Sequence, residues 1–233
     1  MEAAELKNAL REIIPLDSGG SFKLLWDMLY HIRLLKYVRQ SDLKAINPRY
    51  SKICSTKKLD RLVELGLLSN ANKDVFTATD AAVALLRGLK YNTKTLPRTI
   101  SGDGLTNELN NTEVFIQALN LPDYKALLYP VFADQDKPYL RPDALLIRMK
   151  RDGYKLEFLE VEASKAGWND WLENKRINYL RLAKDRQAYA YWKAQCSYLE
   201  MPVPDIKEFK FSVTFVCSVR RDFGQGFNFV ESL

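Results

Sequence analysis

The sequence predicts a mixed α/β protein made of two domains. In the first ninety residues, apolar side chains recur every three or four positions, as on helices. Residues 140–162 and 209–219 are instead apolar runs or alternating patterns, as in strands. Residues 91–104 between them are polar and contain Pro97, Gly102 and Gly104, which is typical of a linker. We predict a first domain over residues 1–95, a linker over 96–104, and a sheet flanked by helices over 105–233.

Length and composition fit a globular protein. A chain of 233 residues suits two small domains or one large one. No run approaches the ~20 apolar residues of a membrane span, and the N-terminus lacks the apolar core of a signal peptide. The three cysteines form no CxxC pair, which argues against a zinc knuckle or a disulfide framework. We therefore expect a cytoplasmic protein with no membrane partner.

Positive charge is concentrated in the N-terminal part of the chain. Residues 1–100 hold 17 Lys and Arg against 10 Asp and Glu, a net charge of +7. The remaining residues hold 18 against 19, a net charge of −1. Such asymmetry is typical of a domain that binds a polyanion, most simply double-stranded DNA. The alternative is a solvated basic face without a partner.

The order of elements in the first domain predicts a winged helix-turn-helix. We expect helices over residues 21–38, 43–46, 51–65 and 80–89, with a glycine stop at Gly66 and a short strand over 75–79. The segments LDRLVELGLLS and VFTATDAAVALL resemble those of winged-helix regulators. In that architecture the third helix enters the major groove and the hairpin touches the DNA backbone.

This architecture gives a set of candidate DNA contacts. The basic side chains would bind phosphates, and the two hydroxyl side chains would touch base edges or phosphates. The set comprises Lys44, Arg49, Lys52, Ser55, Thr56, Lys57, Lys58, Arg61 and Lys73. A winged helix used for protein contacts is the alternative interpretation.

The second domain is predicted to be a sheet flanked by two helices. The helices are expected over residues 105–119 and 168–193. The strands are expected over 126–132, 140–149, 155–162 and 209–219, with a hairpin turn at Arg151-Asp152-Gly153. Residues 221–233 are expected to be irregular.

Acidic residues on these strands suggest a metal site. Alternation along residues 155–162 puts Glu160 and Glu162 on one otherwise apolar face, where unpaired carboxylates are costly. A hard divalent cation is one partner that would offset this cost. Asp143, at the start of the preceding strand, would supply a third oxygen ligand. We therefore predict that Asp143, Glu160 and Glu162 bind Mg²⁺ or Mn²⁺ if the site is catalytic, and that no cofactor is needed otherwise.

The same residues resemble the core of the PD-(D/E)XK nucleases. Pro142-Asp143 fits the first motif and Glu160 the second, whereas Glu162 stands where those enzymes have a lysine. The runs Pro-Asp-Ala and Leu-Glu-Val-Glu more closely resemble the replication-relaxation family of plasmid and mobile-element proteins, which implies a winged helix followed by a nuclease-like domain of the restriction-endonuclease type.

Other residues are candidates for the remaining roles at such a site. Lys175 is our candidate for the missing lysine, because it shares a helix stripe with Trp171 and Tyr179. Lys165 is the alternative. The first helix of nuclease-like domains often donates a carboxylate, here Glu108 or Glu113. Asn107 stands where the replication-relaxation family tends to have a histidine, and the only histidine, His31, is expected to be structural.

Two functions remain open from the sequence. One is a metal-dependent endonuclease that acts in plasmid or mobile-element replication, mobilisation or DNA processing, with Asp143, Glu160, Glu162 and Lys175 as its catalytic residues. The other is a non-catalytic winged-helix regulator or accessory protein whose second domain mediates assembly. In that case the carboxylates are simply paired with basic residues of the long helix. The expected partners are double-stranded DNA and either a second copy of the chain or other replication or mobilisation proteins.

Overall fold

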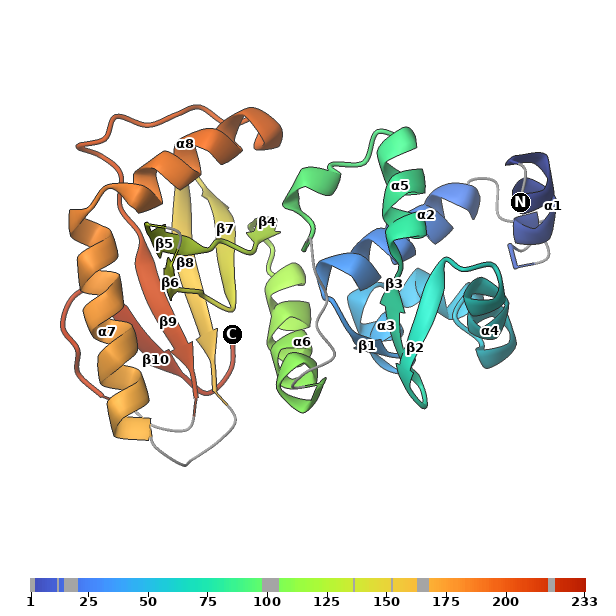
Figure 1. Cartoon of the computed structure of the whole chain (residues 1–233), viewed down its shortest axis with the longest axis horizontal. Helices are drawn as coiled ribbons and strands as arrows, with labels where there is room; N and C mark the ends of the chain where they lie inside the picture. Colours follow the sequence, from blue (N-terminus) through green and yellow to red (C-terminus); the bar gives the residue numbers. More distant parts are fainter. Residues whose placement is uncertain are drawn as a thin grey trace. The chain divides into compact units, whose positions relative to one another are not determined.

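The computed structural model describes residues 3–11, 13–14, 21–97, 105–135, 137–151, 153–162, 168–217 and 221–233 (Figure 1). The predicted mixed α/β class is confirmed. The chain divides into two compact units, Met1–Ile116 and Gln117–Leu233. No helix in the described ranges is both long enough and apolar enough to cross a membrane.

The first unit is mainly helical with a small sheet. The strands are β1 (Val38–Arg39), β2 (Leu68–Asn72) and β3 (Val75–Ala78), in the antiparallel order β1-β3-β2. The helices are α1 (Ala3–Arg11), α2 (Ser21–Leu34), α3 (Asp42–Ile46), α4 (Thr56–Glu64), α5 (Asp80–Gly88) and most of α6 (Leu105–Leu119), with short 3-10 helices η1 (Pro48–Lys52) and η2 (Thr93–Thr95). Leu25, Met28, Leu29 and Ile32 of α2 are fully buried and form the centre of the core.

The boundary between the units lies within α6, later in the chain than the predicted linker. The bounds of this helix match the prediction, but most of it belongs to the first unit. The hydroxyl of Thr112 donates to the carbonyl of Tyr37 at 2.7 Å, and Lys36 pairs with Glu108 at 2.9 Å. Such contacts join residues more than seventy positions apart, so apolar spacing along the chain could not reveal them.

Backbone turns account for the other differences in this unit. Helix α2 ends at Leu34 because Lys36 takes a left-handed φ of 66° and Val38 then pairs with Phe76. The predicted helix over residues 51–65 is η1 followed by α4, whose N-cap is Ser55. Residues 69–74, which lie between the predicted helix over 51–65 and the predicted strand over 75–79, mostly belong to strand β2.

The second unit is a five-stranded sheet in the order β10-β9-β8-β7-β4. Strands β4 (Tyr124–Leu128), β7 (Ala144–Lys150) and β8 (Gly153–Val161) are antiparallel, whereas β9 (Ser212–Val216) and β10 (Phe227–Val230) continue the sheet in parallel. A separate small hairpin consists of β5 (Phe132–Asp134) and β6 (Lys137–Leu140).

Two helices, α7 (Trp168–Lys184) and α8 (Gln187–Leu199), cover one face of this sheet (Figure 1). Leu156 and Phe158 of β8 pack in one core with Tyr179 of α7 and Trp192 of α8. The predicted single helix over residues 168–193 is therefore two helices, because Arg186 has a φ of 60° and turns the chain. The C-terminal residues predicted to be irregular include β10, which pairs with β9.

Candidate functional site

Asp143, the residue directly before β7, lies against the end of β8. The backbone N–H of Asp143 donates to the carbonyl of Leu159 at 3.1 Å. One carboxylate oxygen of Asp143, Oδ2, accepts a hydrogen bond from the N–H of Val161 at 2.7 Å. Since Ala144 pairs with Leu159 in the sheet, the side chain of Asp143 is fixed beside Glu160 by the register of the two strands.

Glu160 is buried beneath α7 with both carboxylate oxygens occupied. Its relative exposure is 0%. Oε1 accepts a hydrogen bond from the hydroxyl of Tyr179 at 2.7 Å, and Oε2 accepts one from Nζ of Lys175 at 2.6 Å. Lys175 and Tyr179 are four residues apart on α7, so both side chains point to the same stretch of β8.

Lys175 links three elements at this point. Besides Glu160, its ammonium donates to the carbonyl of Arg141 at 3.1 Å and stands 5.6 Å from the ring centroid of Trp171. An ammonium near an aromatic face gains a cation–π attraction. The partly buried positive charge is thus balanced by one carboxylate, one carbonyl and one ring.

Burial dominates the electrostatics of the site. It raises the pKa of Glu160 to about 8, and the nearby carboxylate of Asp143 acts in the same direction, whereas Lys175 and Tyr179 oppose the change. Burial also raises the pKa of Tyr179 well above its usual value, so this hydroxyl stays protonated and donates a hydrogen bond to Glu160. A carboxyl group in this setting changes its charge near neutral pH, and a nearby cation favours the ionised form.

The structure brings together three of the four predicted catalytic residues, Asp143, Glu160 and Lys175. Glu162, the third predicted metal ligand, directly follows strand β8, which ends at Val161, and its backbone N–H donates to the carbonyl of Val216. Within the described ranges no three His, Cys, Asp or Glu side chains lie close enough together to hold one metal ion. Lys165 lies outside the described residues.

The two carboxylates proposed from the helix over residues 105–119 both form ion pairs with basic residues near α2 and β1. Glu108 pairs with Lys36 at 2.9 Å and Glu113 with Arg39 at 2.7 Å, both within the first unit. Tyr179, by contrast, was recognised only as a neighbour of Lys175 on the helix stripe. Its four-residue spacing from that lysine was the signal that could have placed it at the site.

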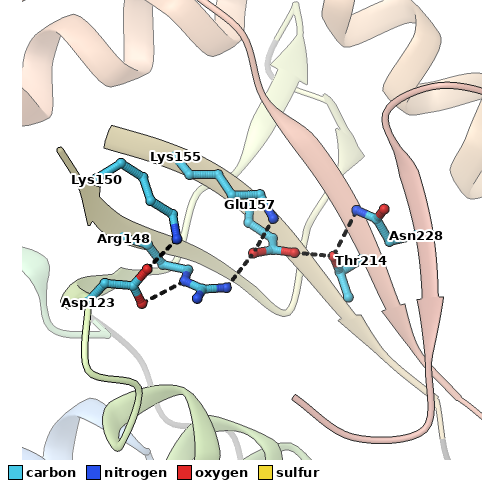
Figure 2. Close-up of polar contacts among 7 residues, drawn as sticks. All are labelled: Asp123, Arg148, Lys150, Lys155, Glu157, Thr214 and Asn228. Carbon is cyan, nitrogen blue, oxygen red and sulfur yellow. Dashed lines mark hydrogen bonds and ion pairs between the residues drawn. The ribbon is translucent and has the colours of Figure 1, made fainter. Parts of the chain in front are cut away.

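The opposite face of β8 carries a second polar cluster that the sequence analysis missed (Figure 2). Glu157, only 5% exposed, accepts a hydrogen bond from the hydroxyl of Thr214 and lies 3.1 Å from Nζ of Lys155. Arg148 lies 3.9 Å from Glu157. Asp123 pairs with Arg148 at 2.8 Å and with Lys150 at 2.6 Å. These two cations lower the pKa of Asp123 to about 2. The three cations and two carboxylates of the cluster pair with one another, which fits a structural role that joins β7, β8, β9 and the loop before β4.

In the first unit, a hollow of about 880 Å³ collects several of the predicted DNA contacts. Its lining comes from α3, the residues around the N-cap of α4, and the turn between β2 and β3. It contains Lys44, Ser55 and Lys73 from the predicted set and adds Arg39, which the sequence analysis did not select. Residues distant in sequence thus form one concave basic surface.

The remaining predicted contacts differ in whether their side chains already pair with other residues of the protein. Thr56 donates to Gln40 at 3.3 Å, Lys58 donates to the carbonyl of Lys52 at 2.7 Å, and Arg61 pairs with Glu64 at 2.8 Å. The other basic side chains are exposed and make no hydrogen bond or ion pair with residues in the described part of the chain; they are Lys44, Arg49, Lys52, Lys57 and Lys73.

Comparisons with known protein families, with curated proteins and with solved structures gave no match.

Proposed function

We propose that the first unit is a winged helix-turn-helix domain that binds double-stranded DNA. The order α3, η1, α4 and the β2–β3 hairpin, with a three-stranded sheet, supports this assignment. In this interpretation α4 is the recognition helix and the turn holding Lys73 is the tip of the wing. The observation that carries the proposal is the concave basic surface that joins Lys44 of α3 to Ser55 and Lys73.

The chemistry of this surface suits a phosphate backbone. Lys57 is exposed in the first turn of α4, where the helix dipole also favours a negative charge. Lysines that neutralise phosphates release counterions, so binding should weaken steeply with added salt.

The test of DNA binding is a salt titration with a 30-base-pair duplex. We expect K44Q/K73Q to reduce the slope of log affinity against log salt by about 1.8, because each lost phosphate contact removes about 0.9. R87Q/K90Q removes the same charge from exposed residues of the same unit that do not line the hollow, and it should leave the slope nearly unchanged. Equal losses in both variants would show that only the overall charge of the unit matters.

For the second unit we propose a nuclease-like fold with a metal-dependent site, as a second candidate function. Asp143 and Glu160 offer the two carboxylates with which proteins commonly bind Mg²⁺ or Mn²⁺ alongside a phosphate substrate. When bound, such a cation would stabilise charge on a phosphodiester and activate water. Lys175 would balance the negative charge of Glu160, and Tyr179 would hold that carboxylate in place.

The observation that favours this candidate is the convergence of Asp143, Glu160 and Lys175 from β7, β8 and α7. Resemblance to the replication-relaxation family supports a role in plasmid or mobile-element replication, mobilisation or DNA processing. In the non-catalytic alternative, the same ion pair only fastens α7 to the sheet.

Two measurements on the same variants separate these possibilities. If the site is catalytic, wild-type protein nicks supercoiled plasmid with Mn²⁺, and D143N and E160Q lose both nicking and Mn²⁺ binding by calorimetry while they remain folded. If the wild type neither binds Mn²⁺ nor nicks with any divalent ion, and D143N melts early, the carboxylates serve the fold alone.

A further inference from the structure

A hollow of about 730 Å³ lies in the second unit, along the half of α7 that follows the carboxylate site. Its walls come from α7, the start of α8, the segment before β9 and the residues that lead into β10. Ligand pockets commonly measure about 300–1,000 Å³, so this volume accommodates a nucleobase with its sugar. We call it the aromatic–basic pocket, after its two kinds of lining side chain.

Aromatic side chains form the floor of the pocket. Tyr189, Phe209, Phe211 and Phe227 all line it and are only partly buried. The rings of Tyr189 and Phe209 meet edge to face at 5.4 Å, and Phe211 packs at 5.1 Å against Phe158 of the core. These contacts fix the rings while part of their surface stays exposed, and fixed aromatic rings are surfaces on which bases stack.

Basic side chains form the rim. Four of its residues, Lys184, Arg186, Lys207 and Lys210, are exposed, and their side chains make no hydrogen bond or ion pair with residues the structure describes. Arg181, on the same helix, is different, because it pairs with Asp134 at 2.7 Å. The described lining contains no Asp or Glu, so the four charges favour an anion above an apolar floor.

We propose that the aromatic–basic pocket binds single-stranded DNA, with bases on the aromatic floor and phosphates at the basic rim. Unpaired bases offer the faces that such a floor needs, whereas in a duplex those faces are stacked on their neighbours. The inference rests on the proposed DNA-binding function and specifies the form of DNA that the second unit takes.

Helix α7 connects this pocket to the carboxylate site. Tyr179 lines the pocket, and its hydroxyl also donates a hydrogen bond to Glu160. Lys184 on the rim follows Lys175 by nine residues, which is about 14 Å along a helix. About four stacked nucleotides cover that length, at about 3.4 Å each. A strand of about four nucleotides is thus long enough to span the distance between the basic rim and the part of α7 that covers the carboxylate site.

The affinity test uses the full chain and fluorescein-labelled (dT)12, with excess unlabelled duplex to occupy the first unit. We expect K207Q/K210Q to weaken binding at least tenfold at low salt and to lower the salt slope by about 1.4, since each contact with a single strand contributes about 0.7. K137Q/K193Q removes two exposed lysines of the same unit that lie outside the pocket, and should change the affinity less than twofold. Equal weakening in both variants, or none in K207Q/K210Q, would overturn the proposal.

The location test uses (dT)12 that carries 5-iodouracil, followed by photocrosslinking and peptide mass spectrometry. The crosslink should form at Tyr189 or Phe209. Crosslinks confined to the first unit, or tighter binding of (rU)12 than of (dT)12, would refute the assignment to single-stranded DNA. Duplex binding by the K44Q/K73Q variant is measured separately, so a failure of the pocket and a failure of the first unit give different results.

Discussion

Glu160→Gln should remove a pH dependence of stability that a single buried carboxyl group imposes on the second unit. Burial raises the pKa of Glu160 from 4.5 to about 8. Between these two values the folded chain holds a proton that the unfolded chain has released. Stability therefore decreases as pH rises, by about 1.4 kcal/mol per pH unit, or about 3–4 kcal/mol between pH 5 and pH 8.

The glutamine variant keeps the shape of the site but cannot ionise. Its carbonyl oxygen can accept from Lys175, and its amide can donate to the hydroxyl oxygen of Tyr179. The free energy of unfolding of wild type minus that of E160Q should thus fall with rising pH, because contributions from all other groups cancel in the difference. E173Q, which alters a half-exposed carboxylate on the same helix, should show no such trend.

Urea titrations followed by tryptophan fluorescence, in EDTA, provide the assay. The substitution Trp26→Phe in all variants leaves three tryptophans, all in the second unit, so the signal reports that unit. A difference that does not vary with pH would refute the reasoning. A wild type that gains stability between pH 3 and 5 relative to E160Q would show instead that Lys175 keeps Glu160 ionised, with a lowered pKa.

Two further predictions concern α7 and α8. Lys175→Met should cost about 3 kcal/mol at pH 9, where Glu160 loses its partner as an anion, but only about 1 kcal/mol at pH 6, where the carboxyl is protonated. Arg176→Met breaks a half-exposed pair with Glu173 and should cost at most about 1 kcal/mol at either pH; equal costs for the two variants in urea titrations would contradict this. Glu200→Gly should raise the melting temperature by a few degrees, since Glu200 holds a φ of 54° after α8 and glycine avoids a steric cost of about 1–2 kcal/mol there, of which its larger loss of chain entropy offsets a part. Glu200→Ala, measured by the same thermal scan, should give no gain.

Local patterns predicted the parts of the site that depend on local geometry. Alternation along β8 and four-residue spacing on α7 together indicated that Glu160 and Lys175 meet, and these two residues lie only 15 positions apart in the sequence. The break at Arg186 was missed because an arginine carries no signal for a left-handed backbone. The pairing of β10 with β9 and the cluster around Glu157 depend on contacts between one strand and another, which periodicity within a single strand does not encode.

The two faces of β8 differ in the sequence separation of the residues that form their polar contacts. On the Glu160 side, the hydrogen bonds span 15 to 19 residues, so the β7–β8 hairpin and the first turns of α7 suffice to form them. On the Glu157 side, Thr214 comes 57 residues later and pairs only after both helices have been made. Because long loops close slowly, we expect the site around Glu160 to assemble early in folding. The carboxylate of Glu157, on the opposite face, should remain hydrated until β9 pairs with β8. The same strand would thus start the unit's folding on one side and complete it on the other.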